Sequence, residues 1–71
     1  MAKPKPPYFA FGRRIAAARK AMKMTQRALA EKVGITNVYA NRIERGRNMP
    51  SMSVITRIGI ILNVTVSELL K

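Results

Sequence analysis

The stretch TQRALAEKVGITNVYANRIERGRNMPS, residues 25–51, decides the fold, because it contains start and stop signals for two consecutive short helices. Thr25 can cap the first helix, and Gly34 suits the left-handed turn that commonly ends one. Thr36 can cap the second helix, which we expect to run to about residue 45 and to stop at Gly46. The sequence therefore predicts a helix, a glycine-containing turn and another helix.

Helical patterns continue on both sides of this stretch. From Tyr8 onward, apolar residues recur at three- and four-residue spacing and predict a helix whose narrow apolar stripe is Phe11, Ile15, Ala18 and Met22. After the central stretch, Ser51 can cap a fourth helix with a core face of Val54, Ile55, Ile58, Ile61 and Leu62. Thr65 and Glu68 form a capping-box pattern before a short fifth helix. The predicted fold class is all-α, a compact five-helix domain over residues 8–71.

Residues 1–7, MAKPKPP, contain three of the four prolines and predict a flexible basic tail ahead of the domain. Such a tail could lie along a binding partner as an arm or contact nothing. It shows no secretory signal, and the longest apolar run, residues 58–62, is far too short to span a membrane. The absence of Cys agrees with a reducing compartment, so we expect a cytoplasmic protein without membrane contact.

Charge and composition exclude several functions. The chain has 14 Lys and Arg against three Glu, a net charge of +11, and it has neither His nor Cys. A zinc site and thiol or imidazole catalysis are therefore excluded, and three scattered glutamates cannot form a catalytic carboxylate pair in one chain. We expect no enzymatic activity, no metal, no cofactor and no small-molecule ligand. Residues 1–48 hold twelve basic and two acidic residues (+10), which fits a polyanionic partner.

The helix expected after Thr36 has two different faces. On a helical wheel, Tyr39, Ala40 and Ile43 fall on the side that can pack on a core. The opposite side carries Asn37, Val38, Asn41 and Arg42 in place of the usual Lys and Glu. Arg can pair with guanine, Asn with adenine, and a Val methyl can meet the thymine methyl. This face is therefore predicted to contact bases of double-stranded DNA, while the N-terminus at Thr25 attracts a phosphate.

The pattern of these residues resembles the helix-turn-helix domain of the lambda repressor and Cro family, also called the XRE family. The matching elements, in order, are Arg19, Thr25-Gln26, Leu29-Ala30, Val33-Gly34-Ile35, Ile43-Glu44-Arg45-Gly46 and Pro50-Ser51. The similarity covers about residues 11–70. It implies a domain that binds a palindromic operator in the major groove, usually as a homodimer, and we expect a transcriptional repressor.

Carried over by position, the resemblance implies roles for single residues. Base contacts fall to Asn37, Val38, Asn41 and Arg42, and backbone contacts to Thr25, Gln26, Thr36, Arg47 and Asn48. Arg19 and Glu44 match a pair that commonly forms a structural salt bridge, which explains why a charged residue lies beside the apolar stripe of the helix expected from Tyr8 onward.

The last third of the chain is the predicted dimer interface. Residues 49–71 carry two basic residues and one acidic residue (+1), so two copies of this segment would hardly repel each other. Ile60 lies opposite the core stripe of its helix, and near Val64 or Val66 it would form a small apolar patch. The alternative is that Ile60 covers the fifth helix within one chain.

Three other classes of function compete with an operator-binding repressor. An antitoxin-type interaction module with secondary DNA binding would use the same apolar C-terminal third. RNA binding usually needs exposed aromatic residues, whereas Tyr39 is expected to be buried. An amphipathic membrane binder fits least, because the apolar and basic segments are organised as a packed domain.

Overall fold

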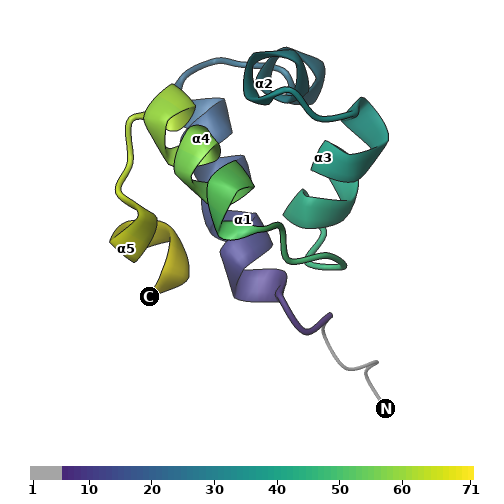
Figure 1. The fold of residues 1–71 in the computed structure, drawn as a ribbon, viewed down its shortest axis with the longest axis vertical. Coiled ribbons are helices and arrows are strands. Elements are labelled where there is room, and N and C mark those ends of the chain that lie inside the picture. The colour runs from purple at the N-terminus through teal and green to yellow at the C-terminus, as the bar shows by residue number, and fades with distance from the viewer. Residues whose placement is uncertain (1–5) are drawn as a thin grey trace.

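The computed structural model describes residues 6–71, so the first five residues of the predicted tail lie outside the described part. Residues 6–71 form five helices and no strand: α1 (Phe9–Ala21), α2 (Gln26–Val33), α3 (Asn37–Glu44), α4 (Met52–Leu62) and α5 (Val66–Leu70). The predicted all-α, five-helix class is confirmed. Figure 1 shows α4 crossing in front of α1, with α2 and α3 to one side and α5 to the other.

All five helices contribute to one hydrophobic core. Its buried members are Phe11, Ile15, Leu29, Val33, Ile43, Ile55, Ile58, Leu62 and Leu69. The predicted core face of α4 is present, with Val54 and Ile61 half-buried at its margins. Each large side chain fully removed from water stabilises the fold by about 1.5–3 kcal/mol, so this cluster holds the five short helices together.

Side-chain caps start four of the helices where the sequence predicts them. The hydroxyl oxygens of Thr25, Thr36 and Ser51 accept hydrogen bonds from backbone amides in the first turns of α2, α3 and α4. Thr65 and Glu68 form the complete capping box of α5. Gly34 has a φ of 85°, the left-handed conformation that glycine adopts without steric cost, and it ends α2.

The end of α1 differs from the sequence prediction. Met22, assigned to the apolar stripe, is 46% exposed, because the helix ends at Ala21 and Met22 is the C-cap residue. The backbone then reverses at Lys23, whose φ is 55°. This reversal turns Met24 toward the core, where it packs against the buried cluster.

Gly12 is the point at which α1 supports α3. A Cβ atom at this position would lie 2.5 Å from the carbonyl oxygens of both Ile43 and Glu44, closer than carbon and oxygen can approach. A glycine on α1 therefore lets this helix pass against the backbone of α3. Nearby, the Tyr8 amide donates to the Gly46 carbonyl at 3.1 Å and joins the start of α1 to the end of α3.

Within residues 6–71, every helix is too short or too polar to cross a lipid bilayer.

Candidate nucleic-acid interface

The outward face of α3 carries the residues that the sequence assigns to base contacts. Ala40 and Ile43 are buried and Tyr39 is half-buried, so α3 is anchored on its inner side. Asn37, Val38 and Arg42 are exposed, and the Val38 side chain is 71% exposed despite being apolar. α3 packs on α1 and α2, and its exposed face is polar apart from Val38.

The N-terminus of α2 is the second part of this surface. Thr25 is exposed, and its hydroxyl oxygen accepts from the Ala28 amide at 3.0 Å. The first amides of a helix have no acceptor within it, and the helix dipole makes this end attractive to an anion. Thr36 forms the same type of cap on α3 through the Tyr39 amide, also at 3.0 Å. Both helix starts can therefore donate to phosphate oxygens.

Arg19 and Glu44 form an ion pair beneath the interface. Arg19 Nε donates to Glu44 Oε2 at 2.7 Å and Nη2 donates to Oε1 at 3.0 Å, a bidentate geometry. Arg19 Nη1 also donates to the carbonyl of Met24 at 2.8 Å. The hydrogen bonds to Glu44 raise the pKa of Arg19 above its ordinary value. Since the two side chains are only 12% and 7% exposed, the pair joins α1 to α3 inside the domain.

Glu44 also fixes the orientation of two amide side chains. Its Oε1 accepts from Gln26 Nε2 at 3.2 Å, and Gln26 Oε1 accepts from Asn41 Nδ2 at 3.3 Å. A carboxylate can only accept, so the NH₂ group of Gln26 must face Glu44 and its oxygen must face Asn41. Asn41 must then direct its own NH₂ group inward to Gln26. One half-buried Asn on α3 is thereby held with its amide orientation defined.

Another hydrogen bond restrains Arg42, at the other end of the outward face of α3. Arg42 Nε donates to Asn48 Oδ1 at 2.7 Å, which links α3 to the loop before α4. The Arg47 amide donates to the Arg42 carbonyl at 2.9 Å, and the Arg47 side chain is exposed beside it. The structure thus brings the predicted base-contacting and backbone-contacting residues together in two pairs, Gln26 with Asn41 and Asn48 with Arg42.

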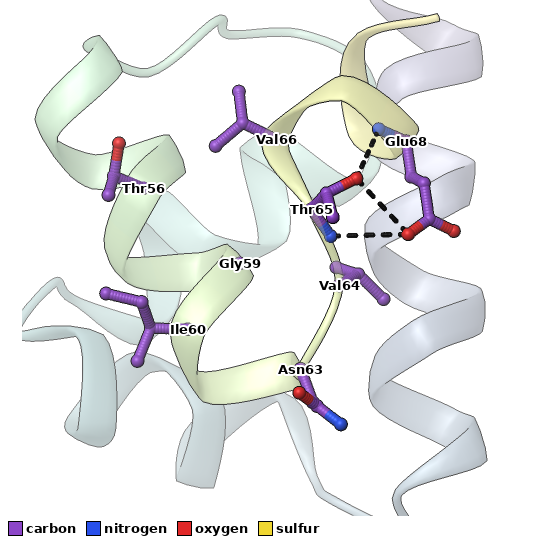
Figure 2. Close-up of a pocket in the computed structure, with 8 residues that line it drawn as sticks. All are labelled: Thr56, Gly59, Ile60, Asn63, Val64, Thr65, Val66 and Glu68. Carbon is purple, nitrogen blue, oxygen red and sulfur yellow. Dashed lines mark hydrogen bonds between the residues drawn. The ribbon is translucent and has the colours of Figure 1, made fainter.

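The predicted dimer residues lie elsewhere on the molecule. Ile60 is 72% exposed on α4, whereas Val64 and Val66 are half-buried and pack partly on the core. They share a groove of about 430 Å³ between α4 and the segment leading into α5, shown in Figure 2. α5 packs on α1 and α4, on the side of the domain away from α3 (Figure 1).

Two arginines have structural roles that sequence reasoning missed. Arg57 Nη1 donates to the Val33 carbonyl at the end of α2, at 2.9 Å. Arg14 Nη1 donates to the Leu69 carbonyl in α5, at 3.3 Å. A cation near the C-terminus of a helix is favourable. However, Arg57 lies 24 residues from Val33 in the chain, and Arg14 lies 55 residues from Leu69. No local sequence signal connects residues so far apart.

Comparison with known proteins agrees with this geometry. The family model described as helix-turn-helix matches residues 15–69, a span that includes α2, the Gly34 turn and α3. The chain belongs to the helix-turn-helix family. The resemblance to lambda repressor and Cro proteins inferred from the sequence is thereby confirmed.

Relatives of this helix-turn-helix chain include bacterial and phage regulators. It is 39% identical over 59 residues to the uncharacterized HTH-type transcriptional regulator YazB of Bacillus subtilis, covering 83% of this chain and 86% of YazB. It is 41% identical over 58 residues to the immunity repressor protein of Bacillus phage phi105, covering 82% of this chain. The matched region spans 40% of the length of that repressor.

A solved structure extends the likeness to a helix-turn-helix protein bound to DNA. The P22 c2 repressor protein, in complex with a synthetic operator, matches with a TM-score of 0.83 and 34% identity. The match covers 86% of this chain and 92% of that one. The family and the fold are those of DNA-binding transcription regulators and not those of enzymes.

Proposed function

We propose that this protein is a sequence-specific transcriptional regulator that binds a double-stranded DNA operator, most simply as a repressor. The observation that carries the proposal is the outward face of α3, where Asn41 and Arg42 each donate a hydrogen bond to a residue outside α3, Gln26 and Asn48 respectively. Restrained side chains lose less conformational freedom on binding, so they suit recognition better than mobile ones. The P22 c2 repressor supports the proposal, because it has this fold in a complex with operator DNA.

Each residue on this face has a chemical counterpart in the major groove. Arg42 suits guanine O6 and N7, Asn37 and Asn41 suit adenine N6 and N7, and the Val38 methyl groups suit the thymine methyl. The proposed backbone contacts are Thr25, Gln26, Thr36, Arg47 and Asn48, of which Gln26 and Asn48 are hydrogen-bonded to residues of α3. The net charge of +11 supports attraction to phosphate at any sequence, while the α3 face provides discrimination.

We also propose that two copies bind a palindromic site together. One short helix reads few base pairs, and a two-fold dimer doubles the site at a spacing of about 34–36 Å. The groove lined by Ile60, Val64 and Val66 is our candidate contact. It contains the exposed Ile60, and it lies in residues 49–71, whose net charge is +1 although that of the whole chain is +11. Charge therefore opposes self-association less there than on the basic part of the molecule.

The exposed Ile60 favours one other function, that of an antitoxin-type module that binds a protein partner through the same groove. In that case the groove would remain unpaired in the isolated protein, and DNA binding would be secondary. We also infer a cytoplasmic location, because an operator-binding regulator must reach DNA.

Selection of bound sequences from a random duplex pool tests the proposed function. We expect a consensus with two inverted half-sites, and we expect Arg42→Ala to relax one base pair in each half-site. A pool that shows no enrichment over random sequence would contradict sequence-specific binding. Enrichment of a single, non-repeated half-site would retain DNA recognition and contradict the dimer.

A further inference from the structure

Asn48 is joined to the recognition face although it lies outside α3. Its Oδ1 accepts from Arg42 Nε at 2.7 Å. This donor–acceptor distance equals that of the hydrogen bond from Arg19 Nε to Glu44 Oε2. Asn48 is half-buried in the loop, whereas Arg42 is exposed. The neighbouring Arg47 amide also donates to the Arg42 carbonyl, so the loop is fixed relative to the arginine it contacts.

The hydrogen bond from Arg42 to Asn48 leaves the Arg42 guanidinium with one pair of nitrogens, Nη1 and Nη2, for a bidentate contact. A guanidinium has five N–H donors in a rigid planar fork, and two neighbouring nitrogens must act together for bidentate recognition. Asn48 takes the Nε hydrogen, so any bidentate contact through Nε is lost. The terminal nitrogens Nη1 and Nη2 remain available as a pair. Such a pair matches the O6 and N7 acceptors of guanine.

Asn48 restrains Arg42 without neutralising it. A carboxylate in the same place would accept the same hydrogen bond, but its charge would cancel that of Arg42 and repel phosphate. The sequence has only three acidic residues, and Glu44 is paired with Arg19 while Glu68 belongs to the capping box of α5. The neutral amide therefore fixes the direction of the cation and keeps its full charge for DNA.

We propose that Asn48 is a positioning residue that makes Arg42 specific for guanine. This inference rests on the proposed DNA-binding function, and it deepens the predicted role of Asn48 as a backbone contact. The two roles use different atoms of one side chain. Oδ1 accepts from Arg42 and sets base preference, while Nδ2 is a donor that can meet a phosphate oxygen.

The test compares two duplexes: the sequence selected from a random pool by the wild-type protein, and the same duplex with the base pair read by Arg42 changed. The Arg42→Ala variant identifies this base pair, because it removes the preference there. The discrimination ratio, defined as the dissociation constant for the changed duplex divided by that for the selected one, is then measured for Asn48→Ala and Asn48→Asp. Arg47→Ala is the matched control from the same loop.

We expect Asn48→Ala to lower the discrimination ratio by about 3- to 10-fold, because Arg42 must then be ordered at binding. In an Arg42→Ala background the same change should leave the ratio unaltered. Asn48→Asp keeps the acceptor, so it should keep the wild-type ratio while weakening binding to both duplexes. Arg47→Ala should likewise weaken both duplexes without changing the ratio.

One result overturns the inference and leaves the proposed function intact: Asn48→Ala weakens both duplexes by the same factor while Arg42→Ala still removes a base preference. Asn48 would then be a phosphate contact and not a positioning residue. Failure of the proposed function is visible without any Asn48 variant, because the wild-type protein would then select no sequence. Unchanged base preference in Arg42→Ala would remove Arg42 from the base contacts and leave DNA binding by other residues in place. Either of these results also overturns the inference. Melting curves followed by circular dichroism establish that each variant is folded before its ratio is compared.

Discussion

Arg19 on α1 and Glu44 at the end of α3 form a bidentate ion pair, with Nε 2.7 Å from Oε2 and Nη2 3.0 Å from Oε1. The same carboxylate accepts from Gln26 on α2. Three helices therefore meet at one acidic group, directly below the proposed DNA-binding face.

Removal of either partner of this pair should destabilise the fold. Loss of one member of a fully buried ion pair costs about 3–5 kcal/mol of folding free energy. Because the two side chains keep 12% and 7% of their surface in water, we expect Arg19→Ala and Glu44→Ala to cost an amount near the lower end, about 3 kcal/mol. Urea denaturation measures the loss, and Lys20→Ala, an exposed basic residue of the same helix, is the control. The double variant Arg19→Met with Glu44→Leu should lose less than either single change. A loss below that of Lys20→Ala would show that the pair is not structural.

The amide of Gln26 gives a pH-dependent prediction. Gln26→Glu replaces the NH₂ group that faces Glu44 by a second carboxyl group, and the like charge raises the pKa of the introduced group in the folded state. At a pH well below the ordinary Glu pKa of about 4.3, the introduced carboxyl is protonated in both states, and the variant should be nearly as stable as the wild type. As pH rises through the ordinary Glu range, the unfolded state ionises first and the variant should lose stability relative to wild type.

Thermal melts of Gln26→Glu and wild type between acid and neutral pH measure this difference. Gln26→Leu, which cannot ionise, is the control: it loses the donor to Glu44 but adds no charge, so its loss of stability should change less with pH than that of Gln26→Glu. A parallel pH dependence in both variants would contradict the arrangement of Gln26 and Glu44.

How much of this surface the sequence predicts depends on the range of each interaction. The caps at Thr25, Thr36 and Ser51 involve residues three positions apart, so they follow from local pattern. The prediction that Met22 belongs to the buried stripe of α1 was wrong. The chain reverses at Lys23 in a left-handed conformation, for which lysine has no strong preference, so the sequence does not signal this turn. The hydrogen bond of Arg14 depends on how α1 packs on α5, and those of Gln26 depend on how α2 packs on α3; residue spacing specifies neither.

Arg42 and Arg47 should have different effects on DNA binding. Arg42→Ala is expected to cost about 1–3 kcal/mol on the best site and to relax preference at one base pair per half-site. Arg47→Ala, like removal of Lys3 and Lys5 from the tail, should weaken all sequences almost equally and reduce the dependence of affinity on salt. Fluorescence anisotropy with selected and random duplexes at several salt concentrations separates the two effects. Unchanged discrimination after Arg42→Ala would remove this residue from the proposed base contacts.

The proposed dimer contact is tested by Ile60→Lys. Because Ile60 is 72% exposed, a lysine there should leave the monomer folded, but it should place a positive charge from each copy in the shared contact. We expect weaker dimerisation in sedimentation equilibrium and weaker cooperative binding to a two-half-site duplex. Ser53→Lys, an exposed position on the same helix outside the groove, adds the same charge and is the control.

Two outcomes would contradict this contact. If Ile60→Lys unfolds, Ile60 supports the α4–α5 packing within one chain. If it dimerises as well as Ser53→Lys, the interface lies elsewhere.

Because Glu44, Gln26 and Asn41 are joined by hydrogen bonds, the positions of α3 should not tolerate substitution equally. If the proposed base contacts hold, a change at Asn37 or Val38, both of which are exposed, should alter the target sequence without disturbing this set of hydrogen bonds. A change at Asn41 disturbs Gln26, and through it the acidic group on which three helices converge. Descendants of this chain that acquire new operators should therefore diverge first at positions 37 and 38 and last at 41, so the order in which target preference drifts is set by the fold.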